Sequence, residues 1–472
     1  MSEGAQKKQE KPRKFQAIRG TRDLLPSETV LWNHVEQTAH AVFGTFGFGE
    51  IRVPIFESTD LFARSIGAET DVVSKEMYTF GGFAEFSERV RGGRMEGMLS
   101  EMQPEEMVSL RPEATASVCR AYIEHGMQQL PQPVKLYYMG PMFRRERPQK
   151  GRYRQFYQIG AEVLGGSDAP AIDAEVIEMV MTFFDRLELQ GVQLDINSIG
   201  HSADNCRRGY VEKLKAALDK VKDKLGPDSQ RRIETNPLRV LDSKVKDEQD
   251  IIATLPRIAD HLCEECAAHY AAVKHELEMR GVFFRENWRL VRGLDYYMRT
   301  TFEITAQGLG SQNAVCGGGR YDGLVELLGG PPTKGIGFAI GEDRLILSLQ
   351  ESGKEVASGE RRVASKERKE VASGRLGVDV YVAWMGERAH ATGIRAAKDL
   401  RKAGFSVELP PVEQKFGKAL GQADKLGAKY ALILGDNEVS EGLWTLKTLA
   451  DGSQAKFTEP DLLEHLRRQK AL

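Results

Sequence analysis

The sequence predicts an α+β core, an antiparallel sheet flanked by helices, followed by a smaller α/β domain. In the core, the stretch Phe143–Glu162 reads as a basic turn followed by residues that alternate with period two, which is typical of a long hairpin. Residues 200–285 change to a charged helical pattern with an apolar stripe, which indicates a helical insertion between strands. From residue 378 onward strand-like and helix-like segments alternate, which favours a largely parallel sheet.

Composition limits the class of protein. The 472 residues are enough for two or three domains, and the formal net charge of −2 gives no global nucleic-acid signal, so any such binding must use local patches. Five cysteines, scattered singly apart from one pair, favour a reducing compartment over a disulfide scaffold. The N-terminus is basic but lacks an apolar core, and no segment is long enough to span a membrane. We therefore expect a cytoplasmic protein.

The domain boundaries follow shifts in composition. Residues 1–14 predict a disordered basic tail, and residues 15–349 hold the core with its insertion. A linker is expected over 350–375, because this run repeats Val-Ala-Ser three times, is densely charged and has no aromatic residue. Residues 376–472 form the second domain.

The first elements of the core are short strands and amphipathic helices. Ser27 can cap a helix that runs to Gly44, because apolar residues recur in it at helical spacing. The stretch 81–107 has weak periodicity and predicts a mobile loop or small insertion. Strands are expected over 50–53, 108–110, 134–139 and 192–196, and helices over 115–125 and 173–187.

The rest of the core and the second domain continue with strand-like and helix-like stretches. Residues 288–304 are strand-like, 308–330 are rich in glycine, and a helix is expected over 338–349, after Gly335 and Gly337. In the second domain strands are expected over 378–384, 405–409, 430–434 and, as a pair, 443–457, with helices over 389–403, 416–426 and 460–470.

The hairpin carries the strongest chemical signal. Its basic half has six cations against the single acid Glu146, and cations on a loop suit phosphates, although a solvated charged hairpin would look the same. On the returning strand Gln158, Gly160 and Glu162 share one face. Because the run around Glu162 is apolar, this carboxylate should be buried and therefore needs partners.

Other polar residues stand in apolar settings. Glu113 and Thr115 lie at a strand-to-helix junction, where they could bind a ligand or simply stabilise the helix start. Arg292 should pair with a buried acid or bind an anion. The glycine-rich stretch 314–323 would let a ligand approach the backbone, or form a flexible hairpin, and Arg344 comes at a helix beginning.

Several common sites are missing or weak. There is no G-x-x-x-x-G-K-[ST] phosphate loop, and the spacing around 317–320 is wrong for a dinucleotide fold. Cys263-x-x-Cys266, with His261 and His269 nearby, has metal-ligand spacing. Because the segment is helical in pattern and no second cysteine pair exists, we interpret it as one face of a charged helix and expect no metal site and no zinc.

Together these stretches resemble the histidyl-tRNA synthetases, which are class II aminoacyl-tRNA synthetases. Residues 143–147 with 152–156 are similar to the second motif of the class, 335–344 to the third, and the segment around 52–54 to the first, which forms the dimer interface in the class. Residues 292–297 and 318–324 resemble two histidine-specific motifs, and the class I motif His-x-Gly-His is absent. The resemblance covers nearly the whole chain and implies an anticodon-binding domain at 376–472.

The resemblance implies roles for individual residues. Arg292 and Arg144 would be catalytic, because they stabilise charge at the α-phosphate of ATP. Arg152 would meet the outer phosphates and Arg344 would stack on adenine. The implied ATP-binding set is Arg144, Arg152, Tyr153 and Arg344. The implied histidine-binding set is Glu113, Ala114, Thr115, Arg144, Gln158, Glu162, Arg292, Tyr296, Tyr297 and Tyr321.

The resemblance also implies partners and a reaction. Histidine would attack ATP, taken with Mg²⁺, to give histidyl-adenylate, and tRNA(His) would then accept the histidyl group. Arg147 and Gln149 on the hairpin loop would touch the acceptor stem, and the chain would act as a homodimer without a membrane. Two rival hypotheses remain open: a catalytically inactive regulatory paralogue in histidine biosynthesis, and an RNA-binding protein with a dead core. Ala114 departs from the family, which commonly has glycine there.

Overall fold

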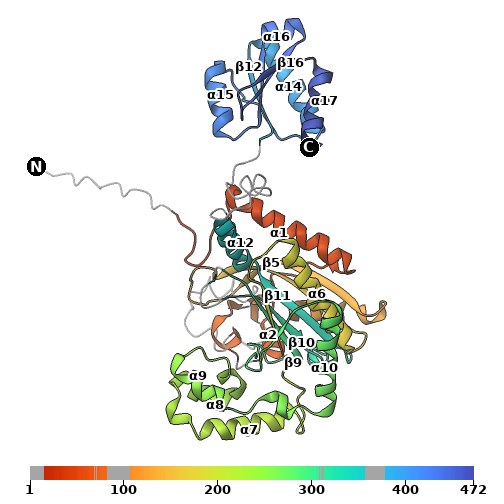
Figure 1. The fold of residues 1–472 in the computed structure, drawn as a ribbon, viewed down its shortest axis with the longest axis vertical. Coiled ribbons are helices and arrows are strands. Elements are labelled where there is room, and N and C mark those ends of the chain that lie inside the picture. Colours follow the sequence, from red (N-terminus) through yellow and green to blue (C-terminus); the bar gives the residue numbers. More distant parts are fainter. Residues whose placement is uncertain are drawn as a thin grey trace, which may run out of the picture. The chain divides into compact units, whose positions relative to one another are not determined.

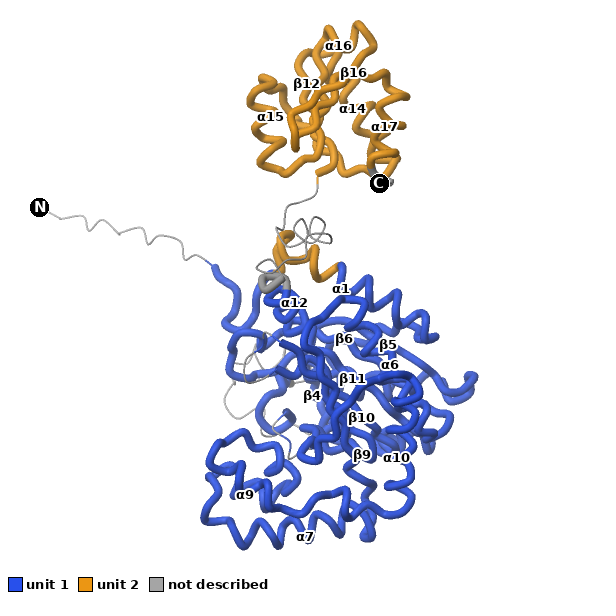
Figure 2. Tube along the Cα trace, in the orientation of Figure 1, with its two compact units in different colours: residues 1–23, 34–360 blue, residues 24–33, 361–472 orange. Residues whose placement is uncertain are grey.

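The computed structural model describes residues 15–67, 70, 72–81, 107–307, 309, 313–356 and 378–471. The predicted tail 1–14, most of the stretch 81–107 and most of the linker 350–375 lie outside the described residues. The chain divides into two compact units, one comprising 1–23 and 34–360 and the other 24–33 and 361–472 (Figure 2).

The first unit is built on an eight-stranded sheet. Its strand order is β1-β5-β6-β11-β10-β9-β7-β8, and the six inner strands are antiparallel, while β1 and β8 lie parallel to β5 and β7 at the two edges. This confirms the predicted antiparallel core. The bounds are β1 Gly49–Glu50, β5 Val134–Phe143, β6 Gln155–Leu164, β7 Gln193–Ser198, β8 Arg285–Glu286, β9 Met298–Thr305, β10 Ala314–Arg320 and β11 Gly335–Gly341.

The long hairpin is formed by β5 and β6. All ten residues of each strand pair, from Val134 opposite Leu164 to Phe143 opposite Gln155. Gln149 and Arg152 close the loop with a bridge, and Gly151 takes φ +75°, a conformation that glycine adopts without strain. The outgoing strand is thus four residues longer than the sequence predicted, because it continues through Gly140 and Pro141.

Helices cover one face of this sheet. α1 (Pro26–Thr45), α6 (Pro170–Arg186) and α10 (Glu264–Met279) are among them (Figure 1). The Phe43 ring contacts Tyr137, Phe183 and Phe338 at centroid distances of 5.5, 5.6 and 6.0 Å. This apolar layer leaves the opposite face of the sheet for other groups.

A small three-stranded sheet and short helices stand beside the large one. The small sheet has the order β2-β4-β3. The bounds are β2 Phe56–Ser58, β3 Thr79–Gly81, β4 Met107–Leu110, α2 Thr59–Ile66, the π-helix Val72–Glu76, α5 Thr115–Glu124, the 3₁₀ turn Met127–Gln129 and α11 Leu324–Leu327.

The predicted helical insertion is present between β7 and β8. It packs its own apolar cluster around Tyr210, Leu214 and Leu218. Its elements are α7 Arg207–Asp219, α8 Pro227–Thr235, α9 Gln249–Ala253, the 3₁₀ turns Lys222–Lys224, Pro237–Val240, Lys246–Glu248 and Ile258–His261, and α10.

Three element predictions were wrong. Residues 335–341 form the central strand β11, and α12 (Glu342–Val356) begins only after it, whereas a helix was expected from Phe338. Arg292 lies outside any strand, because β9 begins at Met298. The strand expected over 50–53 is reduced to Gly49–Glu50. Glycines misled the first of these predictions, since Gly335 and Gly337, which were expected to precede a helix, stand inside β11.

The second unit contains a five-stranded sheet of order β13-β12-β14-β15-β16. β13 and β14 lie parallel to β12, but β15 and β16 are antiparallel, so the sheet is mixed rather than largely parallel. The bounds are β12 Val380–Met385, α14 Glu387–Lys402, β13 Val407–Glu408, α15 Phe416–Lys425, β14 Tyr430–Gly435, α16 Asp436–Glu441, β15 Trp444–Thr448, β16 Gln454–Phe457 and α17 Glu459–Ala471.

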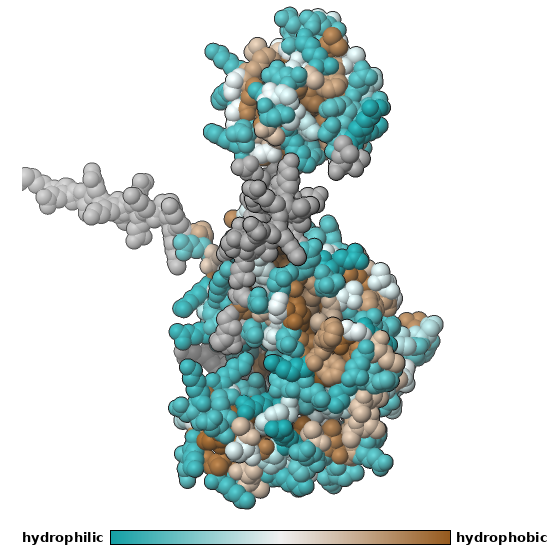
Figure 3. Space-filling model, in the orientation of Figure 1, coloured by the Kyte–Doolittle hydropathy of each residue, from teal (hydrophilic) through white to brown (hydrophobic). Residues whose placement is uncertain are grey.

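The surface of both units is mixed in character. On the face drawn in Figure 3, polar and charged residues dominate and apolar residues form patches between them. Within the described residues, no helix is both long and apolar enough to cross a membrane.

Candidate active site

The strand register places small residues in the middle of the uncovered face of the large sheet. Gly337 of β11 lies between Glu162 of β6 and Gly319 of β10, and Ala339 lies between Gly160 and Gly317 in the next row. Residues opposite one another on antiparallel strands share a face. The middle of this face therefore carries glycines and one alanine, a strip of β10 and β11 on which neighbouring side chains lie directly against the backbone. We call this the glycine trough.

Charged groups bound the glycine trough on both sides. A Cβ on Gly337 would lie 1.8 Å from Glu162 Oε2, and a Cβ on Gly317 would lie 1.9 Å from Arg292 Nη2. The carboxylate and the guanidinium thus lie directly against the glycine backbone. Neither side chain could occupy its position if these two glycines carried a methyl group.

Glu162 is the most buried of these groups, with 1% of its surface exposed. It accepts hydrogen bonds from Thr115 Oγ1, at 2.7 Å, and from the Tyr321 hydroxyl. Burial raises the pKa of Glu162 to about 8, although these two hydrogen bonds oppose the shift. The carboxyl therefore keeps its proton near neutral pH until a donor or cation arrives.

A second buried acid, Glu113, sits at the start of α5. Its carboxylate accepts the amides of Thr115, at 2.6 Å, and Ala116, at 3.1 Å, so it caps the helix as the sequence suggested. Burial raises the pKa of Glu113, while these amides and Arg144 lower it. Ala114 is fully buried between the acid and Thr115.

Three tyrosines line the same region. The Tyr296 ring lies 4.7 Å from the Tyr297 ring and 5.8 Å from the Tyr321 ring, as centroid distances. The Arg292 guanidinium lies 5.9 Å from the Tyr297 ring centroid. Apolar ring faces with inward hydroxyl groups suit a small aromatic ligand that carries polar atoms.

Arg292 is paired with Glu303 of β9. Its Nη1 donates to Glu303 Oε2 at 3.0 Å. Burial lowers the pKa of Arg292, but Tyr297 and Glu303 outweigh it and raise the pKa above its ordinary value. The guanidinium is therefore a fixed positive charge at the edge of the glycine trough.

Several buried polar atoms here lack a partner among the described residues. They include Gln158 Oε1, Arg292 Nε and the Tyr138 hydroxyl. Buried polar atoms in native proteins are nearly always hydrogen-bonded, so a bound polar molecule would complete them.

Arg144 joins the hairpin to this region. Its Nε donates to Pro112 O at 3.0 Å, and its guanidinium lies 5.3 Å from the Phe156 ring centroid. The carbonyl of Pro112 directly precedes Glu113, so Arg144 reaches the N-terminal side of α5.

Arg152 and Arg344 form a second cationic group near the hairpin loop. Burial lowers the pKa of Arg344, and the neighbouring charge of Arg152 lowers it further, whereas Glu303 opposes the shift. Arg152 Nη1 donates to Glu146 Oε2 at 3.3 Å. The charge of Glu303, which binds Arg292, also acts on Arg344.

The hairpin loop borders an open cleft of about 650 Å³. Arg145, Arg147, Gln149 and Arg152 are among its lining residues, together with Lys75 and Glu76. Tyr153 is not among the lining residues of this cleft; the Arg22 guanidinium lies 5.0 Å from the centroid of its ring. A cleft lined by several arginines fits a phosphate-rich ligand.

The predicted site residues thus fall into two connected groups, and their roles stay predictions. Glu113, Ala114, Thr115, Glu162 and the three tyrosines meet beside the trough, while Arg152 and Arg344 are neighbours near the loop. Arg147 and Gln149 line the cleft outside.

The sequence pattern did not reveal Glu303, Asp343 and Arg22. Glu303 is the partner of Arg292, and Asp343 accepts hydrogen bonds from Arg22 Nη2, at 3.2 Å, and the Tyr157 amide, at 2.9 Å. A lone acid between apolar residues of β9 was an available signal for Glu303. Nothing in the sequence joins Arg22 to Asp343, which lie 321 residues apart.

A buried acid on one side of the glycine trough and cations on the other can together hold a small polar molecule next to a phosphate group. No side chain here needs to form a covalent bond, because positioning and charge neutralisation are sufficient for phosphoryl-type chemistry.

Comparison with known proteins agrees with this geometry. Residues 98–345 match the family model described as histidyl-tRNA synthetase, and residues 379–469 match that of an anticodon binding domain. The histidine–tRNA ligase of Solibacter usitatus is 50% identical over 96% of this chain and 99% of its own length, and that of Koribacter versatilis is 49% identical over 97% of each.

The structure itself is similar to solved ones. The apo histidyl-tRNA synthetase of S. aureus superposes with a TM-score of 0.72 at 35% identity, covering 96% of this chain and 99% of that one. A family model over more than half of the chain, and relatives that match along nearly all of it, agree with the class II fold described above. The chain belongs to the histidyl-tRNA synthetase family.

Proposed function

We propose that the chain attaches L-histidine to tRNA(His) in two steps. The histidine carboxylate attacks the α-phosphate of ATP to give histidyl-adenylate and pyrophosphate. A ribose hydroxyl of the tRNA 3′ end then attacks the activated carbonyl, takes the histidyl group and releases AMP. The observation that carries this proposal is the glycine trough, with a buried acid on one side and a fixed arginine on the other.

Histidine is assigned to the acidic side of the trough. Glu162 and Tyr297 take the imidazole, because a buried carboxyl without a cation suits a ring N–H. Glu113, Thr115 and Gln158 take the α-ammonium group, and the free Gln158 Oε1 supports this assignment. Ala114, Tyr296 and Tyr321 line the remaining wall.

ATP is assigned to the arginine side. Arg144 and Arg292 stabilise charge at the α-phosphate and also meet the histidine carboxylate. Arg152 meets the outer phosphates, Arg344 stacks on adenine, and Tyr153 belongs to the same ATP-binding set. Mg²⁺ accompanies ATP and neutralises its phosphates. The reaction as proposed uses no zinc.

The tRNA is assigned to two surfaces. Arg147 and Gln149, on the cleft at the hairpin loop, contact the acceptor stem. We take 15–349 as the catalytic domain, 350–375 as a linker after the tail 1–14, and 376–472 as the anticodon reader, which the family match at 379–469 supports.

The active form is proposed to be a homodimer in the cytoplasm, where tRNA, ATP and histidine occur together. Support for the dimer comes from the surface next to Arg52-Val53-Pro54, where Ile55 is 44% exposed and Phe56 52% exposed. Large apolar side chains exposed in a row are typical of an interface between subunits.

Histidine-dependent ATP–pyrophosphate exchange and charging of tRNA(His) test the proposal. An active enzyme performs both. The regulatory paralogue in histidine biosynthesis would perform neither, and absence of exchange with well-folded protein would reject the enzyme. A chain that exchanges but does not charge would keep the adenylation step and reject the tRNA assignments.

A further inference from the structure

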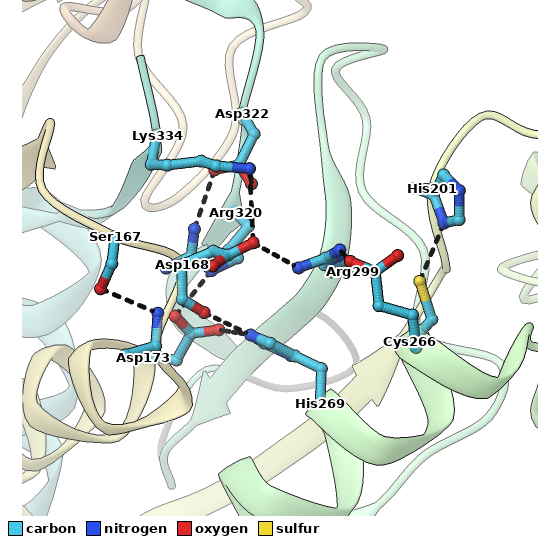
Figure 4. Close-up of polar contacts among 12 residues, drawn as sticks. Ser167, Asp168, Asp173, His201, Cys266, His269, Arg299, Arg320, Asp322 and Lys334 are labelled. Carbon is cyan, nitrogen blue, oxygen red and sulfur yellow. Dashed lines mark hydrogen bonds and ion pairs between the residues drawn. The ribbon is translucent and has the colours of Figure 1, made fainter. Parts of the chain in front are cut away.

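Four side chains of types that can ligate a metal meet at the base of the helical insertion. They are His201, Cys206, Cys263 and Cys266, whose ligand atoms all lie within 4.8 Å of one another. The His201 Nδ1 atom is 3.0 Å from Cys266 Sγ and 3.7 Å from Cys263 Sγ. Figure 4 shows His201 facing Cys266 at the start of α10.

These groups come from the two ends of the insertion. His201 and Cys206 lie on the loop between β7 and α7, and Cys263 is the N-cap residue of α10, with Cys266 in its first turn. The sequence pattern had paired the Cys263 segment with His261 and His269. Those histidines instead contact Lys213, at 3.4 Å, and Asp168 O, at 3.0 Å.

The loop is shaped to bring its donors together. Gly200 takes φ +62°, and a Cβ there would lie 2.6 Å from Cys206 Sγ. Gly200 is held in place by its carbonyl, which accepts the Arg299 amide at 2.8 Å. The backbone thus leaves space for the Cys206 sulfur to point at the other three groups.

Neither a catalytic cysteine nor a disulfide accounts for the whole cluster. A Cys–His nucleophile must reach its substrate, but Cys266 is 0% exposed and Cys206 1%. A disulfide would use two sulfurs and leave the third sulfur and the histidine without a role. Three sulfurs and one imidazole nitrogen are instead the complete ligand set of a closed tetrahedral zinc site, and Cys-x-x-Cys is its usual spacing.

We propose that His201, Cys206, Cys263 and Cys266 bind one structural Zn²⁺ ion that joins the two ends of the helical insertion. With zinc–sulfur bonds of about 2.3 Å and zinc–nitrogen bonds of about 2.0 Å, tetrahedral ligand atoms are about 3.8 Å apart for two sulfurs and about 3.6 Å for sulfur and nitrogen. The spacing of 3.7 Å between Cys263 Sγ and His201 Nδ1 is close to this value. The His201–Cys266 pair, at 3.0 Å, must open by about 0.5 Å, and the widest pair must close by about 1 Å.

Neighbouring charges fit a site with three thiolates and one Zn²⁺, which has a net charge of −1. The guanidinium groups of Arg207 and Arg299 act electrostatically on Cys266. Arg299 also pairs with Glu265, which lies between Cys263 and Cys266 in the sequence. It pairs with Asp168 as well, at 2.9 Å (Figure 4). In metal sites, charged groups beside the ligating side chains hold those side chains in position.

The site also connects to the proposed histidine pocket. Arg207, which follows Cys206, donates from Nη1 to the carbonyl of Tyr297 at 2.5 Å. Zinc would therefore fix the loop that supports Tyr297, although it takes no part in the reaction.

Metal analysis of the purified full-length chain, produced with zinc in the medium, tests the proposal. We expect about one zinc per chain by mass spectrometry and release of that zinc when a mercurial blocks the thiols. Cobalt in place of zinc should give the intense thiolate charge-transfer bands of a sulfur-rich tetrahedral site. These three measurements need no variant.

Matched variants locate the site. Cys206→Ser and His201→Asn should each lose most of the zinc, whereas Cys119→Ala and His261→Asn, which change the same residue types elsewhere, should keep it. Zinc-free protein with three reduced thiols here would overturn the proposal. So would a disulfide between any two of the three cysteines, a metal other than zinc, or zinc that persists in both of the first two variants.

Discussion

The acid at the side of the trough gives the sharpest test of the proposed pocket. Glu162→Gln keeps the size of the side chain and removes its charge. In the free protein the pKa of Glu162 is about 8, so about a tenth of the molecules carry the carboxylate at pH 7 and about half at pH 8. If the imidazole N–H binds the ionised form, the affinity for histidine should rise about fivefold between these pH values.

The Glu162→Gln substitution should remove this pH dependence and weaken the binding of histidine. A hydrogen bond to a charged group contributes about 1.5–3 kcal/mol, so the KM for histidine should rise about 10- to 100-fold at pH 8. The KM for ATP should change less than about twofold, because Glu162 faces the trough from the side opposite Arg292. Pyrophosphate exchange measured between about pH 7 and pH 8 gives both constants.

The raised pKa of Glu162 should also make the stability of the protein depend on pH. In the unfolded chain Glu162 titrates near 4.5, whereas the folded protein keeps the proton up to about pH 8. The unfolded state therefore binds fewer protons in this window, and the free energy of unfolding should fall as pH rises, by about 1.4 kcal/mol per pH unit. In the free enzyme the Gln variant should lack this contribution.

Glu124→Gln, at the exposed end of α5, is the matched control and should behave as wild type. Equal losses for histidine and ATP in Glu162→Gln would refute the imidazole assignment. A flat wild-type profile between pH 7 and pH 8 would refute the reasoning from the pKa.

Three further predictions concern the same reaction. Arg292→Ala should lower the rate of adenylation about 100- to 1000-fold at an unchanged melting temperature, and near-normal pyrophosphate exchange would remove its catalytic role. Gly337→Ala should lower the free energy of unfolding, measured with denaturant, by about 1–3 kcal/mol and should weaken the binding of histidine, because the added methyl group collides with Glu162. Gly421→Ala, in open space on α15, is the control, and equal stability of the two variants would contradict the close packing around Gly337. Removing 376–472 should spare exchange but reduce charging of tRNA(His), and unchanged charging would show that this domain does not read the anticodon.

Period-two alternation was enough to predict the buried acid. Glu162 shares a face with Gln158 and interrupts an apolar run, and in the structure both side chains are buried on one side of β6. The pattern works here because a central strand has only two faces. It could not supply the partners of Glu162, since Thr115 and Tyr321 lie 47 and 159 residues away.

The glycines of β11 were misleading for a physical reason. Gly335 and Gly337 look like a break before a helix, yet both are inside a strand. A Cβ on Gly335 would lie 2.3 Å from the Tyr321 ring, and one on Gly337 would strike Glu162. Glycine is required here by neighbours that are distant in the sequence, which no local pattern reveals.

Long-range pairing accounts for the remaining omissions. The partner of Arg292 is only 11 residues away, but a turn places Arg292 outside the strand that was expected. The cysteine cluster escaped because its two halves are separated by an insertion that folds back on itself, from Cys206 to Cys263. In both cases the number of residues between two side chains does not predict how far apart they lie in the fold.

Because the floor of the pocket is backbone rather than side chain, its shape is tied to the cooperativity of the whole sheet. Gly318 is paired on one side with Phe302 and on the other with Phe338, and both aromatic rings lie on the opposite, covered face. Local loosening of the pocket would require breaking two central ladders at once, so the amides of β10 should exchange hydrogen only on global unfolding. Substitutions that change ligand preference should therefore lie at the rim, because the glycines of the floor carry no side chain.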